Sequence, residues 1–347
     1  MSLEKKEDRI RHYLVPHLDQ FIFDELSENY MKKAGVEDIL TGVPIPIRKT
    51  ELTNISTLNI ARHMAFVIGC DPDFDYASNY IAYIQRIFTK KFAEGLVSDG
   101  VDGAAKNDFD YACIQFRAAI QIDPENVDAV YCYARACKDS YEQGEEEEFV
   151  GRYKAESLDA FERVTLMKPE FAEGHYFLGY AYANLGLYVK AQLEWQEFMK
   201  LSENAEMKKE IEGRLASLVD PVEIEKGYNM IFAGKIVEGI EVLNKYKDGQ
   251  YKTWWPMWYY LGWGYRQLGM IDEAIEHMLE VLKLSPSNTD VMKELVEKYR
   301  EIGDEEKVAK YESKINVVMG NIEKDREEKA KAKAEAAAMS GPIGKMN

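Results

Sequence analysis

Residues 255–288 read WPMWYYLGWGYRQLGMIDEAIEHMLEVLKLSPSN. Counted from the first residue of this stretch, apolar residues at positions four, seven and eleven follow the spacing of one helix face. Small residues at positions eight and twenty, Gly262 and Ala274, allow two antiparallel helices to approach closely. Gly269 at position fifteen is typical of a turn, and Pro286 at position thirty-two ends the second helix. The stretch therefore predicts a pair of antiparallel helices.

The same spacing recurs along the chain. Residues 172–203 and residues from 289 onward follow it in register, and residues 220–253 follow it more loosely. Two further units begin near residues 93 and 127, and the second of them carries about eleven additional residues near 139–152. We therefore expect about six units, which together cover residues 93–320.

This set of residue types, repeated about every 34 residues, resembles the tetratricopeptide repeat family. The resemblance implies an all-α fold, a right-handed superhelical solenoid of tetratricopeptide-type helix pairs. A single pair cannot cover its own apolar face, so neighbouring pairs stack and leave a concave inner surface. The function that the resemblance implies is a protein-interaction scaffold.

The two ends of the chain depart from the repeat. We expect residues 1–92 to form a small N-terminal helical cap or domain, in which residues 12–35, 52–69 and 74–95 are helices. Residues 41–51, TGVPIPIRKTE, are expected to be extended, because each proline pushes the residue before it out of the helical region. Residues 321–347 are expected to form a polar helical extension that ends in a disordered tail, SGPIGKMN.

Composition limits the classes of function. With 46% hydrophobic and 30% charged residues, the chain can bury a core and remain soluble. A formal net charge of −17 argues against a general affinity for nucleic acid or for anionic lipid. The four cysteines form no C-x-x-C pair, and neither a signal peptide nor a long apolar run is visible. We therefore expect a cytoplasmic protein with reduced thiols that binds neither nucleic acid nor membranes.

The resemblance also implies where a partner would bind. In this family, ligands usually lie in the concave groove, against positions two, five, nine, twelve and thirteen of the first helix of each pair. Here these positions present aromatic and polar side chains that stacking of the repeats does not require, of the types enriched at binding hot spots. The candidate peptide-binding residues are Tyr131, Arg135, Lys138, Tyr176, Tyr180, Asn184, Tyr228, Tyr259, Trp263, Arg266 and Gln267.

Two alternatives remain for these residues. Some of the tyrosines could pack against the N-terminal domain or a neighbouring helix, and the surface could serve self-association. Members of the family that grip an acidic carboxyl-terminal tail have Lys at position five and Asn at position nine. Here Tyr131 and Arg135, and then Tyr176 and Tyr180, stand in those places. We therefore expect an apolar or aromatic segment of a protein partner, with an acidic residue near Arg135 and Lys138.

No catalytic or metal-binding pattern is visible in the sequence. The five histidines form no H-E-x-x-H motif, and no phosphate-binding glycine loop occurs. We therefore expect neither an enzyme nor a bound cofactor or metal. The alternative function is a ligand-sensing regulator whose N-terminal region is the output module, which requires residues 1–92 to fold alone. Nearly equal numbers of acidic and basic residues in this region weaken a DNA-binding role.

Overall fold

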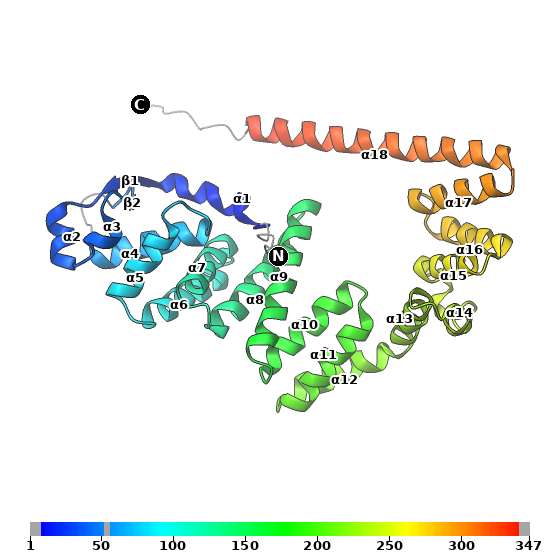
Figure 1. Cartoon of the computed structure of the whole chain (residues 1–347), viewed down its shortest axis with the longest axis horizontal. Coiled ribbons are helices and arrows are strands. Elements are labelled where there is room, and N and C mark those ends of the chain that lie inside the picture. Colours follow the sequence, from blue (N-terminus) through cyan, green and yellow to red (C-terminus); the bar gives the residue numbers. More distant parts are fainter. Residues whose placement is uncertain (1–7, 52–55, 340–347) are drawn as a thin grey trace. The chain divides into compact units, whose positions relative to one another are not determined.

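The computed structural model describes residues 8–51 and 56–339. Contacts divide the chain into two compact parts, residues 1–215 and residues 216–347. We call their described residues the N-terminal module and the C-terminal module. The described chain is an all-α repeat fold with one two-stranded sheet (Figure 1). The boundaries expected at residues 92 and 320 stay predictions.

The N-terminal module begins with short elements and continues with paired helices. Its elements are α1 (Arg11–Leu14), η1 (Val15–Gln20), β1 (Phe21–Glu25), α2 (Glu28–Ala34), α3 (Glu37–Leu40), β2 (Pro44–Arg48), α4 (Thr57–Cys70), α5 (Ala77–Ile87), α6 (Lys91–Ala105), α7 (Phe109–Ile122), α8 (Val127–Gln143), α9 (Glu147–Met167), α10 (Ala172–Asn184), α11 (Tyr188–Leu201) and α12 (Ala205–Ser217). Helices α6 with α7, α8 with α9, and α10 with α11 form the repeat pairs.

The helix predicted over residues 12–35 is wrong. Strand β1 interrupts it and pairs antiparallel with β2, so that Phe21 faces Arg48 and Glu25 faces Pro44. The run Phe21–Ile22–Phe23 has the aromatic and β-branched composition of strands, and the extended segment predicted at residues 41–51 supplies its partner. Residues 52–55 of the helix predicted over 52–69 lie outside the described residues, and α4 covers the rest of it.

The single helix predicted over residues 74–95 is also wrong, because the chain breaks at Phe88 between α5 and α6. Helix α5 buries Tyr80 and Ile84, and α6 buries Ala93 and Leu96. At 3.6 residues per turn, these two sets would lie on opposite sides of one straight helix. The break allows both sets to enter the same core.

The spacing of small residues and glycines has the predicted structural role. A Cβ atom added to Gly179, at position eight, would lie 2.3 Å from Nε1 of Trp195 on the paired helix. Gly186, Gly234, Gly269 and Gly303 end first helices with positive φ, and at Gly269 φ is 74°. Asn107, with φ of 60°, takes this place in the first pair. The glycine turns between helices are therefore confirmed.

The additional residues near 139–152 were expected between or within the two helices of their unit. They lengthen both α8 and α9, so α9 has 21 residues. Residues 205–217, which fall between two repeats in the sequence, form the separate helix α12. Helix α12 follows the third pair directly, and its Ile211 is fully buried.

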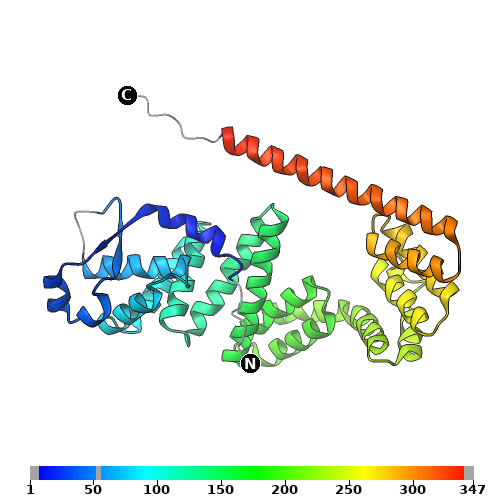
Figure 2. The same ribbon diagram turned by 45° about the horizontal axis from the view of Figure 1, so that its top comes forward.

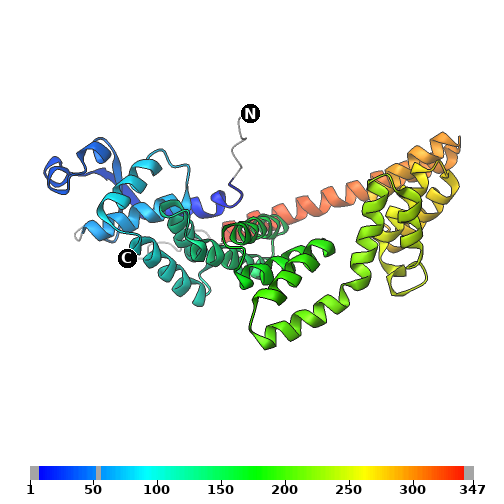
Figure 3. The same ribbon diagram turned by 60° about the horizontal axis from the view of Figure 1, so that its bottom comes forward.

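The C-terminal module contains three further helix pairs. Its elements are α13 (Val219–Phe232), α14 (Ile236–Asn244), η2 (Gln250–Thr253), α15 (Trp255–Gln267), α16 (Ile271–Leu284), α17 (Thr289–Glu301) and α18 (Glu305–Met339). The pairs pack in chain order through buried residues such as Leu261, Met278 and Leu295 (Figure 3). Helix α18 is a single helix of 35 residues, which joins the last repeat helix to the predicted extension (Figure 2). The tail predicted at 340–347 lies outside the described residues.

The N-terminal segment shares its core with the first repeat pair. Buried residues of α3, β2, α4 and α5 form one cluster with Ala118, Ala119 and Ile122 of α7 and with Ala129 of α8. We therefore expect a fragment of residues 1–92 to show no cooperative unfolding, because it would leave this shared apolar surface in water. A fragment of residues 1–168 should unfold cooperatively in urea, as followed by circular dichroism. Cooperative unfolding of the shorter fragment would contradict this expectation.

Candidate functional site

The candidate residues of α8 are engaged within the N-terminal module. The Tyr131 ring packs edge-on against Phe171, with ring centroids 5.0 Å apart. Arg135 donates a hydrogen bond of 3.3 Å to the Tyr131 hydroxyl and lies 4.5 Å from the centroid of Phe177. Lys138 forms an ion pair of 2.6 Å with Glu142 on the same helix. These side chains therefore have partners within the chain, although they are only half-buried.

Two of the candidate residues of α10 form hydrogen bonds with α12. The Tyr176 hydroxyl donates to Glu210 of α12 at 3.1 Å, and the Tyr180 hydroxyl donates to the same carboxylate. Arg214 lies 5.4 Å from the centroid of the Tyr180 ring. Burial, together with Glu210, raises the pKa of both tyrosines. Of the three candidates on α10, Asn184 is exposed, and Tyr176 and Tyr180 are half-buried with their hydroxyl groups bound to Glu210.

A group of contacting aromatic rings, three half-buried and one exposed, lies on α13 and α15. We call Tyr228, Phe232, Tyr260 and Trp263 the aromatic patch. The Tyr228 and Tyr260 rings stack with centroids 4.1 Å apart, and Phe232 lies 4.8 Å from Trp263 and 5.7 Å from Tyr260. Phe232 is 55% exposed. The structure thus brings two predicted residues, Tyr228 and Trp263, together with two that were not predicted.

The sequence contained a signal for one of the two missed residues. Phe232 stands at position thirteen of the unit that begins at residue 220, which is one of the inward positions of the family. The loose fit of this unit to the repeat pattern obscured it. Tyr260 stands at position six of its unit, outside the inward positions, and only its stacking on Tyr228 places it in the patch.

Two of the remaining candidates, Tyr259 and Arg266, link α15 to α17 through Glu294. The Tyr259 hydroxyl donates to Glu294 at 3.1 Å, and Arg266 donates to the other oxygen of the same carboxylate at 2.9 Å. Burial and the Glu294 carboxylate raise the pKa of Tyr259 to about 12. Gln267 is exposed. Tyr259 and Arg266 are therefore packing residues of the repeat stack, outside the aromatic patch.

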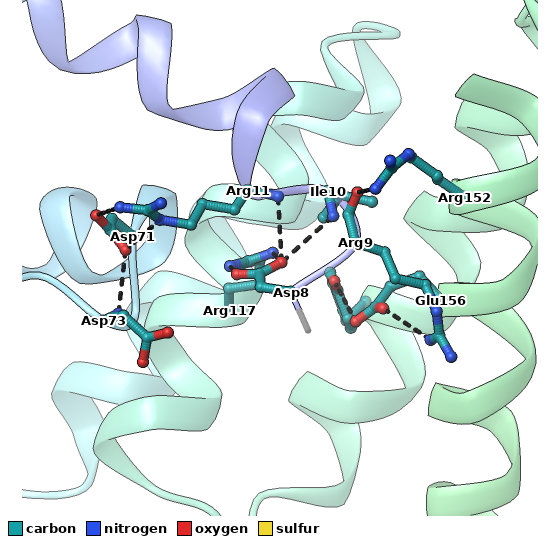
Figure 4. Close-up of polar contacts among 10 residues, drawn as sticks. Asp8, Arg9, Ile10, Arg11, Asp71, Asp73, Arg117, Arg152 and Glu156 are labelled. Carbon is teal, nitrogen blue, oxygen red and sulfur yellow. Dashed lines mark hydrogen bonds and ion pairs between the residues drawn. The ribbon is translucent and has the colours of Figure 1, made fainter. Parts of the chain in front are cut away.

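A network of charged residues holds the start of the described chain (Figure 4). Arg117 of α7 donates to both carboxylate oxygens of Asp8, at 3.0 Å for one of them. Arg11 binds both oxygens of Asp71 at 2.7 and 2.6 Å, and Arg9 pairs with Asp159 of α9. Burial alone would lower the pKa of Arg117, but Tyr133, Asp8 and Glu156 raise it above its ordinary value. Sequence reasoning did not find this network.

A cavity of about 480 Å³ lies beside this network. Its walls include Asp8, Arg117, Tyr133, Glu156 and Arg163. These groups have partners in the chain: the Tyr133 hydroxyl donates to Glu156 at 3.0 Å, and Arg163 donates to the Pro124 carbonyl at 2.9 Å. The cavity is therefore lined by polar groups that are largely paired with one another and that fix residues 8–11 against α7 and α9, although Nε of Arg117 has no partner within the described structure.

Comparison with known families identifies the repeat. The tetratricopeptide repeat profile matches residues 256–288, which form α15, α16 and the turn that follows them. Residues 256–288 are therefore a tetratricopeptide repeat. Repeats of this family serve in general as protein-interaction scaffolds.

Solved structures of other repeat proteins resemble this one. The tetratricopeptide repeat domain of P58(IPK) is 13% identical, with a TM-score of 0.43, over 90% of this chain and 86% of that one. MamA is 16% identical, with a TM-score of 0.28, over 68% of this chain and 96% of that one. A thermophilic repeat protein of Thermus thermophilus, TTC0263, is 14% identical, with a TM-score of 0.31, over 67% and 96%. No curated protein matches the chain in sequence.

The described part of the repeat protein contains no group of three or more His, Cys, Asp or Glu residues placed to hold a metal ion. None of its described helices combines the length and hydropathy needed to cross a bilayer. The four cysteines are free thiols, and the Sγ atoms of Cys113 and Cys137 lie 3.9 Å apart. The expectations of a cytoplasmic location and of no enzymatic activity stay predictions.

Proposed function

We propose that this repeat protein binds a peptide segment of a partner protein on the groove face of its C-terminal module, with the aromatic patch as the anchor. The observation that carries the proposal is the exposure of Phe232, at 55%, within a cluster of four contacting rings. The first helices of two successive pairs, α13 and α15, supply these rings. First helices form the groove in tetratricopeptide repeats.

The chemistry of the patch favours an apolar or aromatic partner segment. Rigid aromatic side chains provide a large contact area at little cost in conformational entropy. Phe232 would gain from removal of its exposed apolar surface from water, at roughly 25 cal/mol per Å². Arg266 is already paired with Glu294 at 2.9 Å, so an acidic partner residue would have to compete with that carboxylate.

The candidate residues of the N-terminal module are already engaged with other side chains, which favours the C-terminal module as the peptide site. The hydroxyl groups of its candidate residues Tyr176 and Tyr180 are bound to Glu210 of α12, and Arg135 is stacked on Phe177. An acidic partner residue near Arg135 and Lys138, which the sequence suggested, would meet side chains that already have partners. We therefore place the peptide on α13 and α15, and not on α8 or α10.

The double variant Phe232→Ala, Trp263→Ala tests the proposal. Peptides selected from a random display library with the full chain as bait should bind this variant at least about tenfold more weakly, a loss of about 1.4 kcal/mol. Isothermal titration calorimetry measures the change. The matched control is Val237→Ala, Leu284→Ala, which removes exposed apolar side chains from the second helices α14 and α16.

The control should bind the selected peptides as the wild type does. Circular dichroism should show equal helix content in all three proteins, which separates loss of binding from loss of fold. Equal affinity of the Phe232→Ala, Trp263→Ala variant and the wild type would remove the aromatic patch from the binding site.

The alternative, a regulator with an N-terminal output module, needs residues 1–92 to act as a separate unit. The core that this segment shares with α7 and α8 weighs against it. We therefore keep the binding scaffold as the proposed function.

A further inference from the structure

A second cleft lies in the N-terminal module, where α4, α6 and α7 meet β2. It has a volume of about 270 Å³ and shares no residue with the aromatic patch. Its walls include Arg48, Arg62, Asp99, Tyr111 and Gln115. Polar side chains thus converge on this cleft from four elements that are far apart in sequence.

Gln115 is the most informative of these side chains. It lies on α7 and is 5% exposed, yet its amide forms no hydrogen bond with any residue that the structure describes. The Tyr111 hydroxyl, one helical turn earlier, likewise has no hydrogen-bond partner among residues 8–51 and 56–339. Both groups line the cleft, so the Gln115 amide and the Tyr111 hydroxyl are available to hydrogen-bond a ligand bound there.

Two arginines beside them are only loosely paired. Arg62 lies 3.5 Å from Asp99, and Arg48 lies 3.8 Å from Glu51. Neither guanidinium forms a hydrogen bond within the described chain. Charge-assisted hydrogen bonds normally span about 2.7–2.9 Å, as the bidentate pair of Arg11 and Asp71 does at 2.7 and 2.6 Å.

Aromatic contacts hold one of these arginines in place. The Arg48 guanidinium lies 5.6 Å from the centroid of Phe21 and 5.9 Å from that of Phe66. Its Nε atom is buried without a partner in the described structure. Arg48 is therefore a cation held in position by aromatic rings, with a side chain that is 33% exposed at the cleft.

The charges of the cleft are balanced. Two guanidinium groups, of Arg48 and Arg62, face two carboxylates, of Glu51 and Asp99. Burial and the neighbouring Arg48 lower the pKa of His63, which adds little positive charge at neutral pH. The two carboxylates would repel a simple anion, and the two guanidinium groups would repel a simple cation. A ligand that carries one positive and one negative group can place each of them against side chains of the opposite charge.

We infer that this cleft binds a small zwitterionic ligand of the amino acid type. Its carboxylate lies against Arg48 and Arg62, with the Gln115 amide as an additional donor, and its ammonium group lies against Asp99. The cleft is smaller than the pockets of about 300–1,000 Å³ that hold drug-sized ligands, which suits a molecule the size of a single amino acid. The larger cavity beside Arg117 differs, because Asp8 and Glu156 there already form hydrogen bonds with Arg117 and Tyr133.

Binding of free amino acids to the full chain tests the inference. Each of the protein amino acids, at about 10 mM, is added in a thermal unfolding assay, and those that raise the melting temperature are titrated by calorimetry. At least one amino acid should bind. Acetate, methylammonium and inorganic phosphate, each of which carries one sign of charge, should bind at least about tenfold more weakly.

The variant Arg62→Gln assigns the binding to this cleft. The Arg62 side chain is 53% exposed, so its replacement leaves the core intact and should weaken binding about tenfold. The matched control is Arg86→Gln, another exposed arginine in an ion pair, with Asp38, outside the cleft. Three results would each overturn the inference: no bound amino acid, acetate or phosphate bound as tightly as the amino acid, or Arg62→Gln equal to wild type.

Discussion

Replacing Asp8 by Ala is expected to lower the free energy of unfolding by about 3 kcal/mol. Arg117 is 6% exposed and donates to both oxygens of the Asp8 carboxylate. Without this carboxylate, the buried positive charge of Arg117 loses its closest opposite charge. This costs far more stability than the loss of a surface ion pair. Urea unfolding of the full chain, followed by circular dichroism, measures the change.

Two variants act as controls for Asp8→Ala. Asp38→Ala removes an ion pair whose side chains are 65% and 45% exposed, and it should change stability by less than about 1 kcal/mol. The double variant Asp8→Ala, Arg117→Met removes both charges and should recover most of the loss. If Asp8→Ala and Asp38→Ala have equal effects, the network at the start of the described chain does not anchor it.

Replacing Gly69 by Ala is expected to destabilise the protein by about 3 kcal/mol, at the upper end of the usual cost of overpacking. A Cβ atom at Gly69 would lie 2.2 Å from the Ile114 carbonyl oxygen, where α4 crosses α7. Backbone atoms cannot move away as a flexible side chain can, so the two helices would have to separate. The same urea experiment measures the loss.

The matched control is Gly95→Ala, in the interior of α6. A Cβ atom there meets nothing within 4 Å. Because alanine favours helix over glycine, this variant should gain about 0.5–1 kcal/mol. Equal effects of the two substitutions would show that the close approach of α4 and α7 does not require glycine at position 69.

The hydrogen bonds between α12 and α10 bear on where a peptide could bind. In a regular array, the faces of successive first helices form one continuous groove. Here Glu210 of α12 accepts hydrogen bonds from Tyr176 and Tyr180. We therefore place the proposed peptide site on α13 and α15, where Phe232 is exposed beside three half-buried rings.

The sequence by itself determined the helix pairs and the turns between them. Gly179 and Gly262 mark where paired helices approach closely, and Gly269 marks a turn with positive φ. These requirements are local and repeat with a fixed period, so one chain displays them several times. Tyr228 and Trp263 of the aromatic patch were found in the same way.

Only the tertiary structure determined which candidate residues are available to a partner. The contact of Tyr180 with Glu210 spans 30 residues, and that of Asp8 with Arg117 spans 109. The pairing of β1 with β2 and the convergence of Arg48, Asp99 and Gln115 on one cleft are likewise contacts between separate elements. Such contacts occur once and follow no period, because they depend on how the packed helices bring distant side chains together.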